Sequence, residues 1–190
     1  AATLPVAPGS DVVATTDAMV EGVHFLATDA ASDIGWKLLA VNLSDLAAMG
    51  ATPLVHLLTL ALPRAWEAEA AERWLCEFAV GLAEAQENHG VVLAGGDTVA
   101  TPGPLLVSVA MIGHVASGRA LRRGGARPGD GVYVSGWIGD AVLALAARQG
   151  ALGVDDAIPL ELTRRLTRPS PRLALGQRLV GLANACADLS

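Results

Sequence analysis

The sequence predicts an α/β or α+β fold, because strand-like apolar runs alternate with segments of helical periodicity along the chain. Of the 190 residues 52% are hydrophobic, and the mean hydropathy is +0.44, so the chain can bury a sizeable core. This composition excludes an intrinsically disordered chain. The length indicates one full domain, or one domain with part of another.

The N-terminal segments are expected to alternate between strand and helix. Residues 11–16 are typical of a strand that runs into an acidic loop. A helix capped by Ser32 or Asp33 should end at Gly50, which suits a left-handed C-terminal cap. Residues 54–62 then indicate a buried strand that stops at Pro63.

Residues 66–89 predict the clearest helix, which is rich in Ala and Glu and should end at Gly90. Its apolar stripe consists of Trp74, Phe78, Leu82 and Ala85. A short buried strand at 91–94 should deliver Gly95, Gly96, Asp97 and Thr98 at its C-terminal end. Residues 105–115 predict a second long strand.

A basic, glycine-rich loop at 118–130 changes the composition and marks the expected domain boundary. We therefore expect an N-terminal α/β domain over 1–127 and the beginning of a second α/β domain over 128–190. The second part should contain a strand and three helices, at 132–135, 139–148, 159–167 and 171–188.

Composition and charge exclude several classes of function. The net charge of −6 argues against a nucleic-acid binder, and it fits a protein that holds cations. No apolar stretch reaches membrane-spanning length, and no signal-peptide pattern is found, so we expect no membrane association. Cys76 and Cys186 lack metal-ligand spacing and are expected to be buried, reduced thiols of a cytoplasmic protein.

The lysine content restricts how a nucleotide could be bound. Lys37 is the only lysine, and no glycine-rich turn precedes it, so neither a P-loop nor a protein-kinase lysine can be built. Any nucleotide must therefore be bound by arginines, backbone amides and metal ions.

Four aspartates lie at the ends or breaks of apolar segments, namely Asp17, Asp45, Asp97 and Asp188. A carboxylate in such a place is costly unless it is paired, capped or bound to a metal. Oxygen ligands from Asp and Thr suit Mg²⁺ rather than zinc. Asp17 as a cap and Asp97 as a turn residue are the alternative interpretations, whereas Asp45 has no basic neighbour in the sequence to pair with.

Further candidates are His24 and the arginines of the basic loop. His24 is either a ligand-binding side chain or a half-buried loop histidine. The loop arginines form either a phosphate site together with backbone amides, or a solvated basic loop. These arginines are Arg119, Arg122, Arg123 and Arg127.

The motifs together resemble thiamine-monophosphate kinases. The matching segments are TTDAMVEGVHF at 15–25, DIGWKLLAVNLSDLAAMGATP at 33–53, LAGGDT at 93–98, GRALRRGGARPGD at 118–130 and RPSPR at 168–172. They occur in the order of that family and span essentially the whole chain. Asp97 in GGDT disfavours the related aminoimidazole ribonucleotide synthetases, which carry glutamate there.

The resemblance implies phosphorylation of thiamine monophosphate by ATP with several Mg²⁺ ions. It implies an N-terminal domain whose mixed sheet carries packed helices and mediates a homodimer. The magnesium ligands would be Thr15, Thr16, Asp17, Asp45, Asp97 and Asp188. ATP would contact Gly96, Asp97, Arg123 and Ser190, and the substrate would contact His24.

Two departures from the family pattern concern the ends of the chain. An acidic stretch that stands before Ala1-Ala2 in the family, and an aspartate after Ser190, are not in this sequence. We therefore expect these 190 residues to be a fragment with little kinase turnover of its own. The alternatives are another ATP-dependent enzyme of the superfamily, similar to selenophosphate synthetase or the hydrogenase-maturation enzyme, and a non-catalytic nucleotide-binding module.

Overall fold

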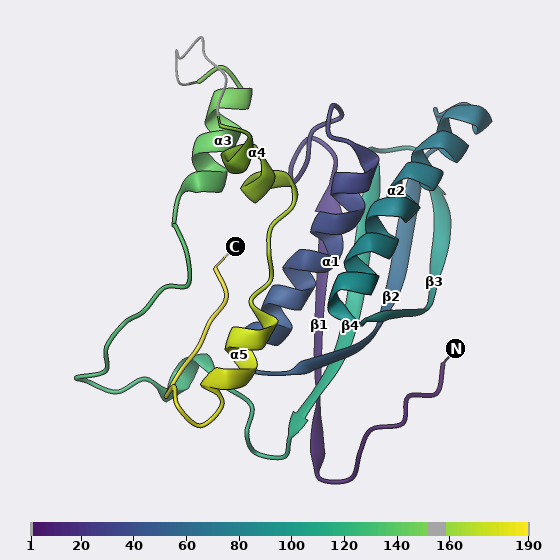
Figure 1. The fold of residues 1–190 in the computed structure, drawn as a ribbon. Helices are drawn as coiled ribbons and strands as arrows, with labels where there is room; N and C mark the ends of the chain where they lie inside the picture. Colours follow the sequence, from purple (N-terminus) through teal and green to yellow (C-terminus); the bar gives the residue numbers. More distant parts are fainter. Residues whose placement is uncertain (1, 152–158, 190) are drawn as a thin grey trace.

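The computed structural model describes residues 2–151 and 159–189, and this part of the chain forms one mixed four-stranded sheet and five α-helices (Figure 1). The α/β class predicted from the sequence is thus confirmed. In chain order the elements are β1 (Ser10–Val20), α1 (Ala31–Ala48), β2 (Thr52–Pro63), α2 (Ala68–His89), β3 (Val92–Thr101), β4 (Leu106–Ala116), the short 3₁₀ helix η1 (Arg123–Gly125), α3 (Asp140–Arg148), α4 (Leu160–Thr167) and α5 (Leu173–Leu179).

The strands are ordered β1-β4-β2-β3 across the sheet. β4 pairs antiparallel with both β1 and β2, whereas β3 pairs parallel with β2. One row of Cα partners runs across all four strands from Asp17 through Val109 and Leu58 to Gly96. The next row runs from Ala18 to Asp97, so β1 and β3 lie at opposite edges of the sheet.

Helices α1 and α2 lie together on one face of the sheet (Figure 1). The core forms between them and the sheet, where Leu38, Leu43, Phe78, Val107 and Met111 are buried. Two glycines permit the close contact of the helices. A Cβ at Gly81 would stand 1.7 Å from the carbonyl oxygen of Ser32, and one at Gly35 would stand 2.4 Å from that of Phe78.

The other face of the sheet is open in the described part of the chain. Apolar side chains lie exposed on it, including Val12 (58% exposed), Leu57 (40%) and Val99 (47%). Such a row of apolar side chains on one sheet face is typical of a surface that another layer covers.

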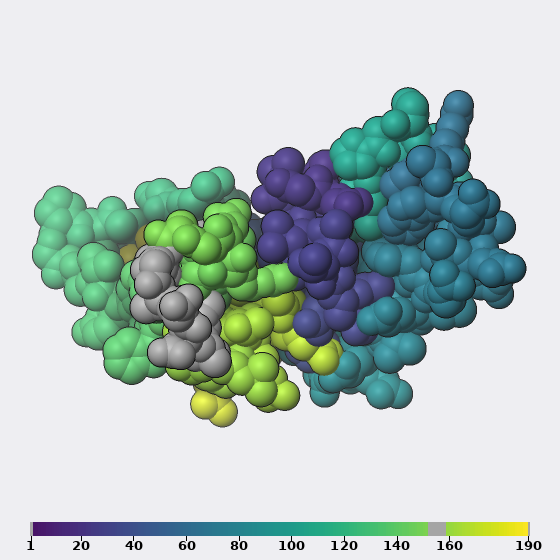
Figure 2. Space-filling view, turned by 90° about the horizontal axis from the view of Figure 1, so that it is seen from above, coloured from purple at the N-terminus to yellow at the C-terminus, as the bar shows by residue number. Residues whose placement is uncertain are grey.

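The C-terminal elements pack beside α1 rather than on the sheet. Figure 2 shows the green and yellow residues of this part gathered to one side of the purple N-terminal segments. Helix α5 contacts the C-terminal half of α1, and α3 packs on α4 (Figure 1). Arg168, between α4 and α5, lies 4.5 Å from the ring centre of Trp36 and pairs with Asp33 and Glu84.

Most predicted elements are confirmed, including the long helix with its apolar stripe and its end at Gly90, whose φ is +65°. Gly50 likewise follows α1 with a φ of +70°. The predicted cap is wrong, because α1 begins at Ala31 and neither Ser32 nor Asp33 caps it. Cys76 is exposed rather than buried, and Cys186 is partly buried; both are free thiols.

The structure corrects the extent of three predicted elements and the existence of a fourth. The first strand continues through Asp17 to Val20, and β3 continues through Gly95 and Gly96 instead of ending before them. Residues 132–135 do not form a strand, since no described segment pairs with them, and Val132 and Tyr133 are almost fully exposed. The last helix covers only Leu173–Leu179 rather than 171–188, because the backbone turns at Gly181 with a φ of +82°.

No helix in the described residues is long and apolar enough to cross a membrane.

Candidate functional site

The alternation of β1 sorts its candidate residues between the two faces of the sheet. Thr15 and Asp17 are half-buried and lie between the core residues Val13 and Met19, on the face that the helices cover. Thr16 lies on the opposite face, where its Oγ1 donates to the carbonyl oxygen of Val109 at 3.0 Å. The structure therefore brings Thr15 and Asp17 together, and it separates Thr16 from them.

Asp45 meets this pair from helix α1. The hydroxyl Oγ1 of Thr15 donates to Oδ2 of Asp45 at 2.5 Å. Burial raises the pKa of Asp45, and the nearby carboxylates of Asp188 and Asp17 raise it further, while the hydrogen bond from Thr15 opposes them. A carboxyl surrounded by like charges favours the approach of a cation.

Asp188 approaches this cluster from the C-terminal segment, close enough for its carboxylate to add to the effect of burial in raising the pKa of Asp45. Helix α5 brings the segment close, because a Cβ at Gly176 would stand only 2.0 Å from the carbonyl oxygen of Ala47 on α1. The position of Asp188 next to Asp45 thus depends on the contact between α5 and α1. Asp188 lies in irregular chain rather than at the end of a long helix.

The basic loop is joined to the same C-terminal segment. The amide of Cys186 donates to the carbonyl oxygen of Arg122 at 3.2 Å, and a Cβ at Gly125 would stand 1.9 Å from the carbonyl oxygen of Asn184. Arg122 and Arg123 are exposed, and within residues 2–151 and 159–189 neither forms a salt bridge. Exposed guanidinium groups that form no salt bridge remain available to an anion.

Asp97 and Gly96 lie away from this cluster, at the opposite edge of the sheet. Three strand spacings separate β3 from β1, which is about 14 Å. Asp97 is exposed on the open face, and its Oδ1 accepts from the amide of Thr98 at 2.9 Å. Position 96 requires a glycine for packing, because a Cβ there would stand 1.9 Å from the carbonyl oxygen of Leu58. Ser190 lies outside the described residues.

His24 is exposed in the loop between β1 and α1. Its Nδ1 accepts from the amide of Val20 at 3.1 Å, and its carbonyl oxygen accepts from Nζ of Lys37 at 3.0 Å. Sequence reasoning set Lys37 aside because it cannot serve a P-loop. An amine placed directly among the apolar residues Trp36, Leu38 and Leu39 was the available signal that Lys37 has a local partner.

The donor set fits Mg²⁺. Thr15, Asp17, Asp45 and Asp188 offer only hard oxygen donors, and Mg²⁺ prefers such donors together with waters and substrate phosphates. Among the described residues, no group of three His, Cys, Asp or Glu side chains could hold a metal ion by itself. An ion bound here would therefore need waters or substrate phosphates as further ligands, which Mg²⁺ commonly uses.

Comparison with known proteins agrees with these features. The family described as AIR synthase related protein, N-terminal domain, matches residues 1–115. The chain is 46% identical to the thiamine-monophosphate kinase of Escherichia coli K12 over 177 residues, which are 93% of this chain and 52% of that protein. It is 44% identical to the enzyme of Caulobacter vibrioides over 190 residues, covering 100% of this chain and 52% of the relative.

Solved structures give the same result. The thiamine-monophosphate kinase of Stenotrophomonas maltophilia superimposes with a TM-score of 0.83 at 45% identity, over 96% of this chain and 57% of that one. A structure of AaThiL complexed with AMPPCP and TMP superimposes with a TM-score of 0.84 at 31% identity, over 95% of this chain and 56% of that one. The hydrogenase maturation protein HypE, at 23% identity and a TM-score of 0.71, shares the fold.

The chain spans about half the length of the curated relatives it matches. The family match covers β1 to β4 and therefore includes Thr15, Asp17 and Asp45. The chain belongs to the AIR synthase related protein family, whose N-terminal domain corresponds to residues 1–115.

Proposed function

We propose that the protein is a thiamine-monophosphate kinase, which transfers the γ-phosphoryl group of ATP to thiamine monophosphate and forms thiamine diphosphate and ADP. One observation carries this proposal beyond the sequence identity. A cluster of Thr15, Asp17, Asp45 and Asp188 lies next to a basic loop whose Arg122 and Arg123 form no salt bridge with any described residue, and the chain segment before Asp188 joins the two. Carboxylates that hold cations beside guanidiniums that bind anions suit a reaction between two phosphates.

The charges of the two substrates explain why such a cluster is needed. Two phosphate groups of about two negative charges each, about 5 Å apart, repel by roughly 13 kcal/mol at an effective dielectric constant of about 20. Several Mg²⁺ ions, when bound, neutralise this charge and align the phosphates. Thr15, Asp17, Asp45 and Asp188 would hold those on the helix-covered face, and Thr16 and Asp97, which lie on the open face, are proposed as further ligands there.

The remaining residues bind and orient the two substrates. Arg123, Gly96, Asp97 and Ser190 are proposed to contact ATP, and His24 to contact thiamine monophosphate. A phosphate oxygen of thiamine monophosphate attacks the γ-phosphorus in line, and ADP leaves with the electrons of the broken P–O bond. No covalent intermediate on the protein is required, and the residues at the site serve to position and to neutralise charge.

We also propose that the active form is a homodimer that closes over the open face of the sheet. The exposed side chains of Val12, Leu57 and Val99 supply an apolar surface for a second copy. Asp97 lies on this same face and would come to lie at the interface, away from Asp17 of its own copy. Sedimentation of the wild type and of Leu57→Glu tests this: a dimeric wild type and a monomeric variant are expected.

The proposed domain division and location follow from the same assignment. We propose residues 1–127 as the ATP- and metal-binding domain and residues 128–190 as the beginning of a second domain. Because ATP is the phosphoryl donor, we place the reaction in the cytoplasm.

The assay that tests the function follows thiamine diphosphate directly. The full-length protein is incubated with ATP, Mg²⁺ and thiamine monophosphate, and aminoimidazole precursors and selenide serve as control substrates. Thiamine diphosphate formed from thiamine monophosphate alone supports the proposal. Turnover with a control substrate only, or Mg²⁺-dependent ATP binding without any product, contradicts it and favours a sister enzyme or a binding module.

A further inference from the structure

The loop that carries His24 is tied to helix α1 by one amine. Lys37 donates from Nζ to the carbonyl oxygen of His24 at 3.0 Å. Lys37 is half-buried, and burial lowers the pKa of its ammonium group, while the carboxylate of Asp29 opposes this. A lysine held in such a place, rather than extended into solvent, requires a partner for its amine, and the carbonyl of His24 is that partner.

The imidazole of His24 is fixed as well as its backbone. The amide of Val20 donates to Nδ1 at 3.1 Å, and the amide of His24 donates to the carbonyl oxygen of Val20 at 2.9 Å. A neutral imidazole whose Nδ1 accepts a hydrogen bond carries its proton on Nε2. His24 is exposed, so its Nε2–H is available as a donor to a ligand.

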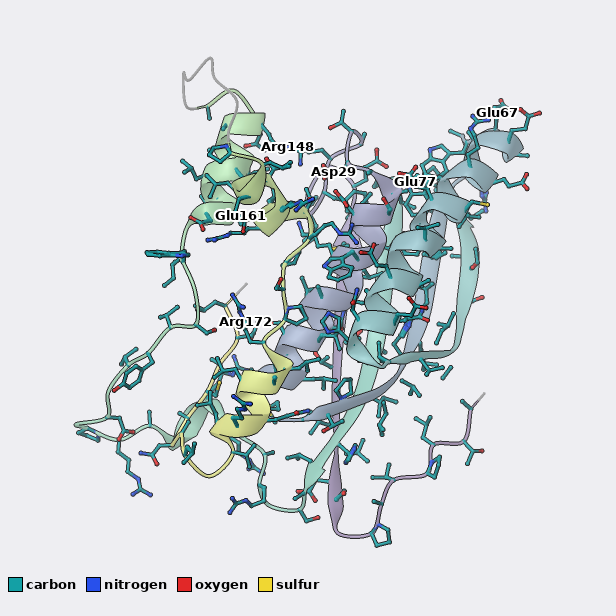
Figure 3. All side chains as sticks on the ribbon, in the orientation of Figure 1. Asp29, Glu67, Glu77, Arg148, Glu161 and Arg172 are labelled. Carbon is teal, nitrogen blue, oxygen red and sulfur yellow. The ribbon has the colours of Figure 1, made fainter. Side chains whose placement is uncertain are left out.

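Other contacts hold the loop on both sides of His24. Phe25 is buried in the core, at 5% exposure, and the amide of Leu26 donates to Oδ2 of Asp29 at 2.8 Å. Arg148 of α3 forms an ion pair with Asp29, and Figure 3 shows the two labelled side chains close together. Among the described side chains, Lys37 is the one that bonds to the backbone of His24 itself.

We propose that Lys37 is a positioning residue: by holding the carbonyl of His24, it sets the imidazole so that Nε2–H donates to an acceptor atom of thiamine monophosphate. This inference rests on the function proposed above. Lys37 acts through His24 and is not among the residues proposed to contact ATP or to hold Mg²⁺. Its loss should therefore weaken the binding of thiamine monophosphate and leave the binding of ATP unchanged.

Kinetics of three variants in the full-length protein test this inference. For Lys37→Met we expect the KM for thiamine monophosphate to rise roughly tenfold, the size expected when a hydrogen bond to a charged donor is lost. The KM for ATP should change by less than about twofold. Lys37→Arg keeps a charged donor and should recover most of the loss. Arg73→Met removes a charge from an exposed position on α2 and is the matched control, for which no change is expected.

A double-variant cycle separates positioning from general damage. His24→Ala should itself raise the KM for thiamine monophosphate, and adding Lys37→Met to it should cost less than about a further twofold. A full additional tenfold loss in the double variant, or equal increases in both KM values in Lys37→Met, would overturn the inference.

A measurement that does not depend on kinase activity tests the role of Lys37 even if the proposed function is wrong. ¹⁵N NMR of the histidine rings should identify the Nε2–H tautomer of His24 in the wild type and a mixture of tautomers in Lys37→Met. If the wild type forms no thiamine diphosphate, the function fails, and this spectrum still tests whether Lys37 sets His24. A wild-type ring protonated on Nδ1, or an identical spectrum in Lys37→Met, refutes the positioning role.

Discussion

Gly176→Ala is the change that tests most directly whether α5 positions Asp188. The added Cβ would stand 2.0 Å from the carbonyl oxygen of Ala47 and 2.7 Å from its carbon. Both of these neighbours are backbone atoms of α1, so neither can rotate away as a side chain would. An ordinary contact begins at 3.4 Å, so α5 must move from α1 by roughly 1.4 Å.

The expected cost has two opposing contributions. Overpacking of this kind costs about 1–3 kcal/mol, and the better helix propensity of Ala returns up to about 1 kcal/mol. We expect a net loss of about 1–2 kcal/mol in the free energy of unfolding, which lowers the Tm by about 4 °C for a chain of this size. Because α5 leads to Asp188, the Mg²⁺ concentration for half-maximal activity should also rise.

Thermal unfolding and Mg²⁺ titration of the full-length protein measure both effects. Gly124→Ala is the matched control, because a Cβ there meets nothing within 4 Å. If Gly176→Ala matches the control in Tm, α5 does not pack rigidly on α1. If the Tm falls and the Mg²⁺ requirement stays the same, the packing does not position Asp188, and that part of the reasoning is wrong.

Three further predictions concern separate parts of the molecule. Burial lowers the pKa of His56 to about 4, so the folded state resists protonation of this side chain. The free energy of unfolding should therefore fall as the pH drops from 6.5 toward 4. Urea unfolding should show a weaker pH dependence in His56→Leu than in the wild type. Asp17→Asn should lower kcat by about 100-fold or more at saturating Mg²⁺, and a loss below about threefold would remove Asp17 from the metal ligands. Trp36→Leu removes the hydrogen bond from Nε1 to the carbonyl oxygen of Pro169 (3.0 Å) and the contact with Arg168. Limited proteolysis after Thr167 should then become faster, and equal rates would show that Trp36 does not hold this segment on α1.

The sequence predicts those elements whose cause is local. The stripe of α2 repeats with helical periodicity, and Gly90 ends the helix at a position that requires a positive φ, so both are visible in the sequence. The buried strand β4 is also predicted, since its apolar residues stand at alternate positions. In these cases the residues themselves carry the information.

The errors arise where distant segments decide the structure. Gly95 and Gly96 suggest the end of a strand, yet β3 continues through them because both pair with β2. The close approach of β2 is possible because position 96 carries no Cβ. Residues 132–135 have the composition of a strand, but none of the described segments pairs with them. In both cases the neighbouring segment, rather than the local sequence, determines the outcome.

The candidate site illustrates the same limit for side chains. Sequence patterns single out Thr15, Asp17, Asp45 and Asp188, and the structure places these four residues near one another, while their role as metal ligands stays a prediction. The predicted strand over 11–16 left Asp17 in a loop, so it did not show that Asp17 shares a face with Thr15 while Thr16 faces away from both. The same alternation places Asp97 on the open face, about 14 Å along the sheet from Asp17. Asp97 and Asp45 therefore cannot share one ion within a copy, and a partner seated on the open face would keep its own Asp45 behind its own sheet. The metal assignment of Asp97 thus requires a separate ion on the open face.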